Sequence, residues 1–281
     1  MSTQTSAVLY IVPTPIGNLD DITTRSLQVL SDVDLIACED TRHSHRLLDH
    51  YSIKTALTAL HEHNERGKAD WLVQQLSEGK NIALISDAGT PLISDPGYHL
   101  VNRVREAGFR VVPLPGACAA ITALSASGLP TDDFRFIGFL PAKSGQRKKV
   151  LQNLSSETST LIFYESPHRI LDSLTDVLDV LSDREAVLAR ELTKTFETFV
   201  TGAVSELIGA LEEDTNQQRG EMVLMVKGID KQAVTTELAD LDTMIMASLK
   251  YLGVKQTSAL LSELTGVRKK EIYQRALEIA E

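Results

Sequence analysis

The segment from Asn81 to Gly97, NIALISDAGTPLISDPG, constrains the fold of this chain more than any other segment. Its apolar run from Ile82 to Ile85 has the length of a buried strand, and it gives way at once to small and acidic residues. Proteins of the α/β class place ligands in such loops, at the carboxyl ends of buried strands. A plain strand–turn–helix, with glycine and proline at the turn, would explain the same pattern. Two acidic clusters so close together exceed what a turn needs, so the segment is a candidate ligand loop.

The same pattern recurs through the first half of the chain. Three other apolar runs each end in a polar or small-residue cluster: Val8 to Val12, Leu35 to Cys38 and Arg110 to Leu114. Helical patterns separate these runs, which predicts right-handed βαβ units with parallel strands. The carboxyl ends of parallel strands lie at one edge of a sheet, so we expect these clusters to meet there.

A second set of elements begins at residues 128–133, where a turn-rich segment predicts a domain boundary. Apolar runs follow at 134–140, 160–164, 186–189, 196–200 and 222–226, and several end in mixed-charge clusters. From about residue 231 only helical patterns remain. We therefore predict an α/β protein with an α/β domain at 1–127, a second α/β domain at 128–230, a ligand cleft between them, and a helical tail at 231–281. The tail resembles a helix-turn-helix, or it packs on its own protein or on a dimer mate.

Composition limits the classes of function. The net charge of −10 argues against a surface coated in basic residues, although it leaves room for a local basic groove. No apolar run approaches the roughly 18 residues of a membrane span, and the N-terminus lacks the basic region of a signal peptide. The two cysteines, Cys38 and Cys118, stand at apolar positions typical of free thiols. We expect a cytoplasmic protein with no membrane partner.

The sequence predicts neither a metal site nor a nucleotide loop of a common type. His61 and His63 do not share a helical face, and no HExxH or Cys/His spacing completes a metal site, so we predict none. The signatures GxxxxGK[ST] and GxGxxG are both absent from the sequence, so it predicts neither a phosphate loop nor a dinucleotide loop of those types.

Nine motifs in order together resemble one family. They are VPTPIGNLDDIT, EDTR, HEHNE, SDAGTPLISDPGYHLV, VPLPGACAAITALSASGLP, FIGFLPAK, LIFYESPHR, ARELTKTFET and GEMVLMV, and they extend to about Lys227. The chain resembles the bacterial 2′-O-ribose cytidine methyltransferases of small-subunit ribosomal RNA, within the tetrapyrrole methylase superfamily. A short helical tail also fits the family, although no motif within it carries the resemblance.

The resemblance implies a cofactor, a substrate and an assembly. The cofactor is S-adenosylmethionine, folded into the cleft between two α/β domains, and the enzyme is a homodimer. The substrate is 16S rRNA, within the small ribosomal subunit, methylated on the ribose hydroxyl of a cytidine in the decoding region. Two alternatives stay open: a tetrapyrrole methylase of the same fold, and a non-catalytic RNA-binding scaffold.

The resemblance also assigns cofactor-binding positions. The superfamily's Gly-Asp-Pro-type loop falls on Gly89-Thr90-Pro91, where Thr90 replaces the acid and Asp87 or Asp95 is a candidate for the missing charge. The full predicted cofactor set is Pro15, Asp87, Ala88, Gly89, Thr90, Ile93, Pro115, Gly116, Ala117, Tyr164, Leu192 and Met222.

Charged clusters at strand ends supply the candidates for catalysis and RNA binding. A ribose hydroxyl is a weak acid, so a general base or a charge near the developing alkoxide should help. We predict Asp40 and Glu165 as acid/base or orienting groups, with Arg42 and Lys194 binding phosphate or stabilising charge. Structural ion pairs are the alternative for each. The predicted RNA-binding residues are His43, Arg46, Lys143, Arg147, Lys148, Lys149, Arg169, Arg268, Lys269 and Lys270; ordinary solvated charge is the alternative.

Overall fold

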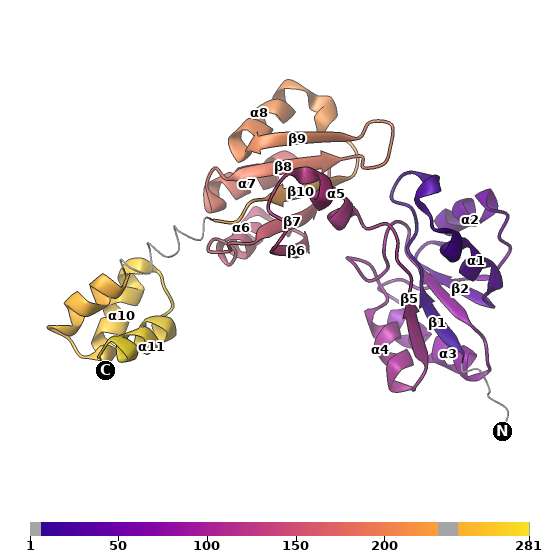
Figure 1. The fold of residues 1–281 in the computed structure, drawn as a ribbon, viewed down its shortest axis with the longest axis horizontal. Coiled ribbons are helices and arrows are strands. Elements are labelled where there is room, and N and C mark those ends of the chain that lie inside the picture. The colour runs from indigo at the N-terminus through magenta and orange to yellow at the C-terminus, as the bar shows by residue number, and fades with distance from the viewer. Residues whose placement is uncertain (1–6, 230–240, 281) are drawn as a thin grey trace. The chain divides into compact units, whose positions relative to one another are not determined.

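A computed structural model describes residues 7–229 and 241–280, which form two compact units. The larger unit contains two β-sheets and comprises the described residues up to 153 together with 160–227. The smaller unit contains the C-terminal helices, together with residues 154–159. Figure 1 shows the elements of both units along the chain. Within the described residues, no helix is both long and apolar enough to cross a membrane.

The first sheet is wholly parallel, as the sequence predicts. Its strand order is β3-β2-β4-β1-β5, and β4 pairs with both β1 and β2 at the centre. The strands are β1 (Val8–Ile11), β2 (Leu35–Cys38), β3 (Leu57–Ala59), β4 (Ile82–Ile85) and β5 (Arg110–Pro113). The helices of this part are α1 (Thr24–Asp32), α2 (Thr41–His50), α3 (Glu65–Ser77) and α4 (Tyr98–Glu106), with a 3-10 turn η1 (Leu19–Asp21).

Two hydrophobic clusters cover the two faces of this sheet. Ile82 and Leu84 of β4 belong to a cluster with α3 and α4. Ala83 and Ile85 point the other way and belong to a cluster with α1 and α2. Because both faces are buried, the strand is an unbroken apolar run rather than an alternating one. All five strands of the first sheet run in the same direction, so the polar loops at their carboxyl ends lie at one edge of the sheet.

Glu65 explains the polar HEHNE motif. The side chain is buried, and its Oε1 accepts hydrogen bonds from the backbone N–H groups of Gly97 (3.0 Å), His99 (2.8 Å) and Leu100 (3.2 Å). A carboxylate at the unpaired N–H groups of a helix start is stabilising. The motif therefore fixes the start of α4 at the end of the loop that follows β4.

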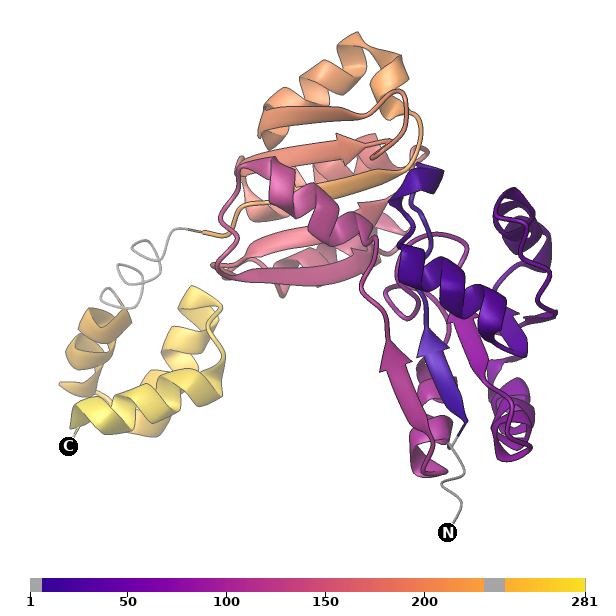
Figure 2. The ribbon, with the colours of Figure 1, turned by 45° about the vertical axis from the view of Figure 1, so that its right-hand side comes forward.

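The second sheet is mixed. Its order is β6-β7-β10-β8-β9; β6 and β7 are parallel, and the other neighbouring pairs are antiparallel. Helix α5 (Ala119–Ser127) packs across one face of this sheet (Figure 2). Its alanines belong to a hydrophobic cluster with side chains of the three central strands. The strands are β6 (Phe134–Phe139), β7 (Thr160–Glu165), β8 (Glu185–Arg190), β9 (Thr198–Ala203) and β10 (Met222–Val226). The remaining elements are α6 (Ser144–Gln152), α7 (Ile170–Leu181), α8 (Val204–Glu213) and the 3-10 turn η2 (Thr215–Gln218).

The smaller unit is helical. Residues 241–249 are helical, followed by α10 (Val254–Thr265) and α11 (Lys269–Ala280), around a core that includes Ile245, Leu261 and Ile272. Gly266 ends α10 in the left-handed region, with φ at 74°. The predicted tail begins at residue 231, so residues 231–240 of it lie outside the described residues. The sequence did not predict that residues 154–159 belong to the same unit as the tail. The predicted domain boundaries at 127/128 and 230/231 stay predictions.

Candidate active site

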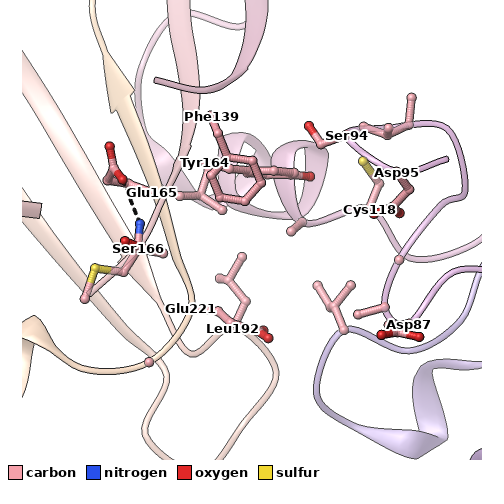
Figure 3. A pocket seen from close by; sticks show the side chains of 18 of the residues that line it. Asp87, Ser94, Asp95, Cys118, Phe139, Tyr164, Glu165, Ser166, Leu192 and Glu221 are labelled. Carbon is pink, nitrogen blue, oxygen red and sulfur yellow. Dashed lines mark hydrogen bonds between the residues drawn. The ribbon is translucent and has the colours of Figure 1, made fainter. Parts of the chain in front are cut away.

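A cavity of about 370 Å³ receives residues from both sheets (Figure 3). Its lining is mainly apolar, with four carboxylates: Asp87, Asp95, Glu165 and Glu221. Eight of the predicted cofactor-binding residues line it: Asp87, Ala88, Gly89, Thr90, Ile93, Tyr164, Leu192 and Met222. The other four, Pro15, Pro115, Gly116 and Ala117, are not part of the lining, whereas their neighbours Ile16, Cys118 and Ala119 are.

The loops after β1 and β4 are joined by backbone hydrogen bonds. Thr14 N–H donates to the Gly89 carbonyl at 2.9 Å, and Gly89 N–H donates to the Thr14 carbonyl at 3.0 Å. Thr14 Oγ1 also donates to the Ser86 carbonyl at 3.1 Å. Gly89 has φ at 80°, a conformation that glycine adopts without strain. The cavity wall at the end of β4 is therefore backbone held in a fixed shape.

Thr90 joins the loop after β4 to the loop after β5. Its hydroxyl donates to the Ala117 carbonyl at 2.8 Å. Gly116 lies against Pro13 so closely that a Cβ there would come 2.5 Å from the proline Cβ. Three strand ends of the first sheet thus form one connected wall, and Thr90 acts in this wall through a hydrogen bond to the backbone.

Strained backbone flanks two apolar side chains that line the cavity. Leu92 (φ 73°) and Ser94 (φ 68°) lie on either side of Ile93. In the second sheet's loop, Glu191 (φ 50°) and Thr193 (φ 65°) flank Leu192 in the same way. Non-glycine residues in the left-handed region cost on the order of 1–3 kcal/mol each and cluster at functional sites.

Acidic side chains gather where the first sheet meets the cavity. Burial raises the pKa of Asp95, and the charge of Asp87 adds to this, against a lowering effect from the Ser86 hydroxyl. Burial also raises the pKa of Glu39, with further repulsion from Asp95, Asp87 and Asp40. The described residues contain no group of three or more His, Cys, Asp or Glu suited to hold a metal ion.

Glu165 lies at the cavity but both of its oxygens are engaged. The carboxylate is buried; Oε1 accepts from Ser166 N–H at 2.8 Å and pairs with Arg169 Nη2 at 2.8 Å. Oε2 accepts from the Ser173 hydroxyl at 2.7 Å. An engaged carboxylate of this kind orients the segment Ser166-Pro167 at the cavity wall and is poorly placed to accept a substrate proton.

Asp40, Arg42 and Lys194 are not part of the cavity lining. Asp40 caps α2 and pairs with Arg42 at 2.8 Å, and Arg42 holds the pKa of the Asp40 carboxyl well below its usual range. Lys194 pairs with Glu191 at 2.9 Å and with the cavity residue Glu221 at 3.0 Å. These contacts match the structural ion pairs named as the alternative to catalysis.

Arg147 corrects the predicted RNA-binding set, because it is buried rather than displayed on the surface. Only 2% of the residue is exposed, and its Nε donates to Asp176 at 2.7 Å. Its Nη1 donates to the carbonyls of Pro141 and Ala142, both at 3.3 Å. The basic stretch KSGQRKK comprises the N-cap Lys143 and the first six residues of α6, and Arg147 is one of the two buried residues of this helix.

The other predicted RNA-binding residues differ in their surroundings. Lys148 pairs with Asp179 at 2.8 Å, and Arg169 is held by Glu165. Arg268, on the smaller unit, pairs with Glu271. The remaining members are exposed: His43, Arg46, Lys143, Lys149, Lys269 and Lys270. None of the ten lines the cavity.

Several residues that line the cavity were not in the predicted set. Asp95 belongs to the second acidic cluster, SDPG, which was the signal available in the sequence; Asp95 was predicted there only as a candidate for the missing charge of the cofactor loop. Phe139 and Glu221 lie in the motifs FIGFLPAK and GEMVLMV, but nothing in these motifs indicates that their side chains face a cavity, because that depends on the shapes of β6 and of the β9–β10 connection. Ser94, Ser166, Pro167, Gly220 and Val223 complete the unpredicted members, besides the three neighbours named above.

Two family models match this chain. The model of the tetrapyrrole (corrin/porphyrin) methylases matches residues 8–208, and that of the RsmI C-terminal HTH domain matches residues 235–280. The chain is 57% identical to ribosomal RNA small subunit methyltransferase I of Escherichia coli O157:H7 over 271 residues, covering 96% of this chain and 94% of that protein. It is also 57% identical to the protein of that name from Vibrio cholerae over 274 residues, with the same coverage.

Two solved structures share the fold. Uroporphyrin-III-C-methyltransferase from Thermus thermophilus has a TM-score of 0.57 at 20% identity, covering 79% of this chain and 94% of that one. A cobalt precorrin-4 methyltransferase has a TM-score of 0.58 at 18% identity, covering 81% and 97%. The likeness extends over about four fifths of the chain, as expected if the smaller unit is an addition to the common fold.

Proposed function

This chain belongs to the ribosomal RNA small subunit methyltransferase I family of the tetrapyrrole methylases, and we propose that it methylates the ribose 2′-hydroxyl of a cytidine in 16S rRNA. The methyl donor is S-adenosylmethionine. The observation that carries the proposal is the cavity at the carboxyl ends of the first sheet's strands, lined by the predicted cofactor loop from Asp87 to Thr90.

The cavity residues fit this cofactor by their chemistry. S-adenosylmethionine carries a positive sulfonium and an α-ammonium group, and Asp87 supplies a carboxylate at the cavity. Apolar surface from Ile93, Leu192 and Met222 suits the adenosyl group. Gly89 offers backbone without a side chain, where a ligand approaches closely.

The reaction needs alignment and a place for one proton. Bound cofactor supplies an activated methyl group for in-line displacement. The fixed walls described above position the two reactants, an effect that does not depend on any single charge. Asp95 is the proposed proton acceptor, because it lines the cavity and its raised pKa favours taking a proton. Glu165 orients Ser166-Pro167 through its bond to Ser166 N–H.

Methyl transfer with three acceptors tests the function. Labelled S-adenosylmethionine is offered with small ribosomal subunits, with naked 16S rRNA and with a tetrapyrrole. We expect label on the cytidine ribose of the RNA in at least one of the first two reactions. Label on the tetrapyrrole alone would favour the small-molecule methylase, and failure to bind S-adenosylmethionine in calorimetry would favour a non-catalytic scaffold.

The proposal includes a cytoplasmic homodimer, supported by the resemblance to the family. Sedimentation equilibrium of the full chain should give twice the mass of 30.8 kDa at micromolar concentration. A single-chain mass at every concentration would contradict it.

The smaller unit is proposed to bind RNA, supported by its match to a helix-turn-helix family model and by exposed Lys269 and Lys270. Truncation after Lys231 should weaken binding to small subunits by about tenfold or more, because several phosphate contacts would be lost. Cofactor affinity, measured by calorimetry, should stay unchanged. Equal loss of both affinities would point to a folding role for the tail.

Lys143 and Lys149 are exposed near the two ends of α6 and are proposed RNA phosphate contacts. Replacing both with glutamate should reduce the slope of log affinity against log salt by roughly two. Lys148→Gln tests loss of a paired lysine on the same helix and should leave the slope nearly unchanged, because Lys148 is already paired with Asp179 and Asp176. An unchanged slope in the double variant would exclude this patch from the RNA path.

A further inference from the structure

Strand β6 contains a bulge that changes which way its last residue points. Phe136 pairs with Ile162 of β7, but Gly138 pairs with Phe163 and Phe139 with Tyr164, so Ile137 has no partner in the register. Successive side chains of a strand alternate between faces, and one extra residue therefore reverses the alternation. Without the bulge Phe139 would face away from Tyr164. With it, Phe139 shares the face of Ile162 and Tyr164 and lines the cavity.

Phe139 is an unusually exposed aromatic for a cavity residue. The side chain lines the cavity, yet the residue is 56% exposed. Its ring lies edge-to-face on Tyr164, with centroids 5.6 Å apart, and Tyr164 packs in the same manner on Phe136 at 4.9 Å. Figure 3 shows Phe139 beside Tyr164 at the cavity. Tyr164 is fixed in turn, because its hydroxyl accepts from Ala120 N–H at 3.3 Å. One side of the Phe139 ring therefore packs on a fixed neighbour, Tyr164, while the rest of the ring is exposed.

Two arginines fix the chain that follows Phe139. Arg169 Nη1 donates to the Leu140 carbonyl at 3.4 Å, and Arg147 donates to the next two carbonyls, those of Pro141 and Ala142. Both guanidinium groups are held by carboxylates, Glu165 and Asp176. Three successive carbonyls are thus tied to two charged pairs. An exposed ring on so firmly held a segment is preorganised for contact, which limits the entropy lost on binding.

The substrate places a flat ring next to the reacting atom. In a nucleotide the carbon that carries the 2′-hydroxyl is bonded to the carbon that carries the base, so a cavity that receives this hydroxyl must receive the base beside it. Proteins bind unpaired RNA bases by stacking them on aromatic side chains. We propose that Phe139 is the platform on which the base of the methylated nucleotide stacks, an inference that rests on the proposed function.

The adenine of the cofactor is the competing occupant of this ring. A cofactor at the predicted loop lies against Gly89, Thr90 and Leu192, among residues held by the strand-end loops. Phe139 instead lies on β6, an edge strand of the second sheet, and over half of the surface of Phe139 is exposed to solvent. A polymeric substrate arrives from solvent, so an open ring suits the RNA base better than a ligand enclosed by loops.

Steady-state methylation of small subunits tests the inference. Phe139→Leu keeps an apolar side chain but removes the π-face, and we expect kcat/KM for subunits to fall by roughly 5- to 100-fold, mainly through KM. Phe139→Tyr and Phe139→Trp should restore it. S-adenosylmethionine affinity, measured by calorimetry, and the unfolding temperature should match the wild type in all three variants. Phe134→Leu is the matched control, because this exposed phenylalanine lies on the same strand outside the cavity lining and should change nothing.

Each result decides the question. Wild-type kinetics in Phe139→Leu would overturn the platform while leaving the methyltransferase function standing. A fall in cofactor affinity equal to the fall in kcat/KM would assign the ring to adenine and likewise overturn it. Equal losses in the Leu, Tyr and Trp variants would show a packing role instead of stacking. A wild-type protein inactive on small subunits would overturn the proposed function, and this inference with it.

Discussion

Replacing Asp95 with asparagine is expected to lower kcat by about 10²–10⁴-fold without weakening the fold. Asparagine fills the same space but cannot take the proton that leaves the ribose hydroxyl. The wild-type pH–kcat profile should have an acidic limb above the usual range of an aspartate, because burial and the nearby Asp87 raise the pKa of Asp95. That limb should be missing from the residual activity of the variant. Methylation rates at saturating substrate, from acid to neutral pH, measure both effects.

Stability should change in the opposite direction to activity. A carboxyl with a raised pKa in the folded state favours folding below its unfolded-state pKa, and this contribution is lost as pH rises through the folded pKa. At neutral pH the ionised Asp95 therefore costs stability, and Asp95→Asn should raise the free energy of unfolding. Glu39→Gln is the matched control: burial and repulsion from Asp95, Asp87 and Asp40 raise the pKa of Glu39, but it is not part of the cavity lining.

Glu39→Gln should therefore also raise the free energy of unfolding, and it should keep the wild-type kcat. If Asp95→Asn retained wild-type kcat, Asp95 would not be the proton acceptor. If Glu39→Gln lost as much activity as Asp95→Asn, the general charge of the cluster, rather than one residue, would be responsible.

Replacing Asp176 with alanine should lower the free energy of unfolding by about 3–5 kcal/mol. Asp176 is 5% exposed and is the ionic partner of the buried Arg147. Arginine stays charged at any pH the protein tolerates, so the variant would leave an unpaired buried charge. Urea unfolding at neutral pH measures the loss.

A double variant separates the burial of charge from the loss of packing. Arg147→Met with Asp176→Leu removes both charges and fills the space, so much of the stability should return. If the double variant were as unstable as Asp176→Ala, packing rather than unpaired charge would explain the loss. Its methylation kinetics also report on Phe139, because Arg147 ties the two carbonyls at Pro141 and Ala142.

The parallel first sheet and the strand-end loops could be predicted because their signals are local. Buried strands such as Ile82–Ile85 are short apolar runs, and the loops that follow them must be small or polar. Helix α2 was not predicted: only Ser44 and Leu48 are buried in its ten residues, so its narrow apolar face was overlooked among polar residues. Strand β3 has three residues, too few for any periodic pattern. Helices α6 and α8 were likewise not predicted.

The roles of charged residues were harder to predict than their positions. EDTR and ARELTK do lie at strand ends, but whether a carboxylate faces a cavity or a neighbouring arginine depends on rotamers and on side chains distant in sequence. Arg147 and Asp176 are 29 positions apart, and nothing local marks their contact. The direction in which Phe139 points depends on one unpaired residue in β6. That residue reverses the alternation of side chains between the two faces, which is the pattern from which strand faces are predicted.

The four left-handed residues around Ile93 and Leu192 set a limit on how stable this chain can become. Leu92, Ser94, Glu191 and Thr193 keep part of the free energy gained on folding as backbone strain, next to the place where ligands are expected. Glycine at these positions would relieve the strain, and it would also increase the conformational freedom of the two loops. Selection for greater stability and selection for turnover would therefore act in opposite directions on the same four residues.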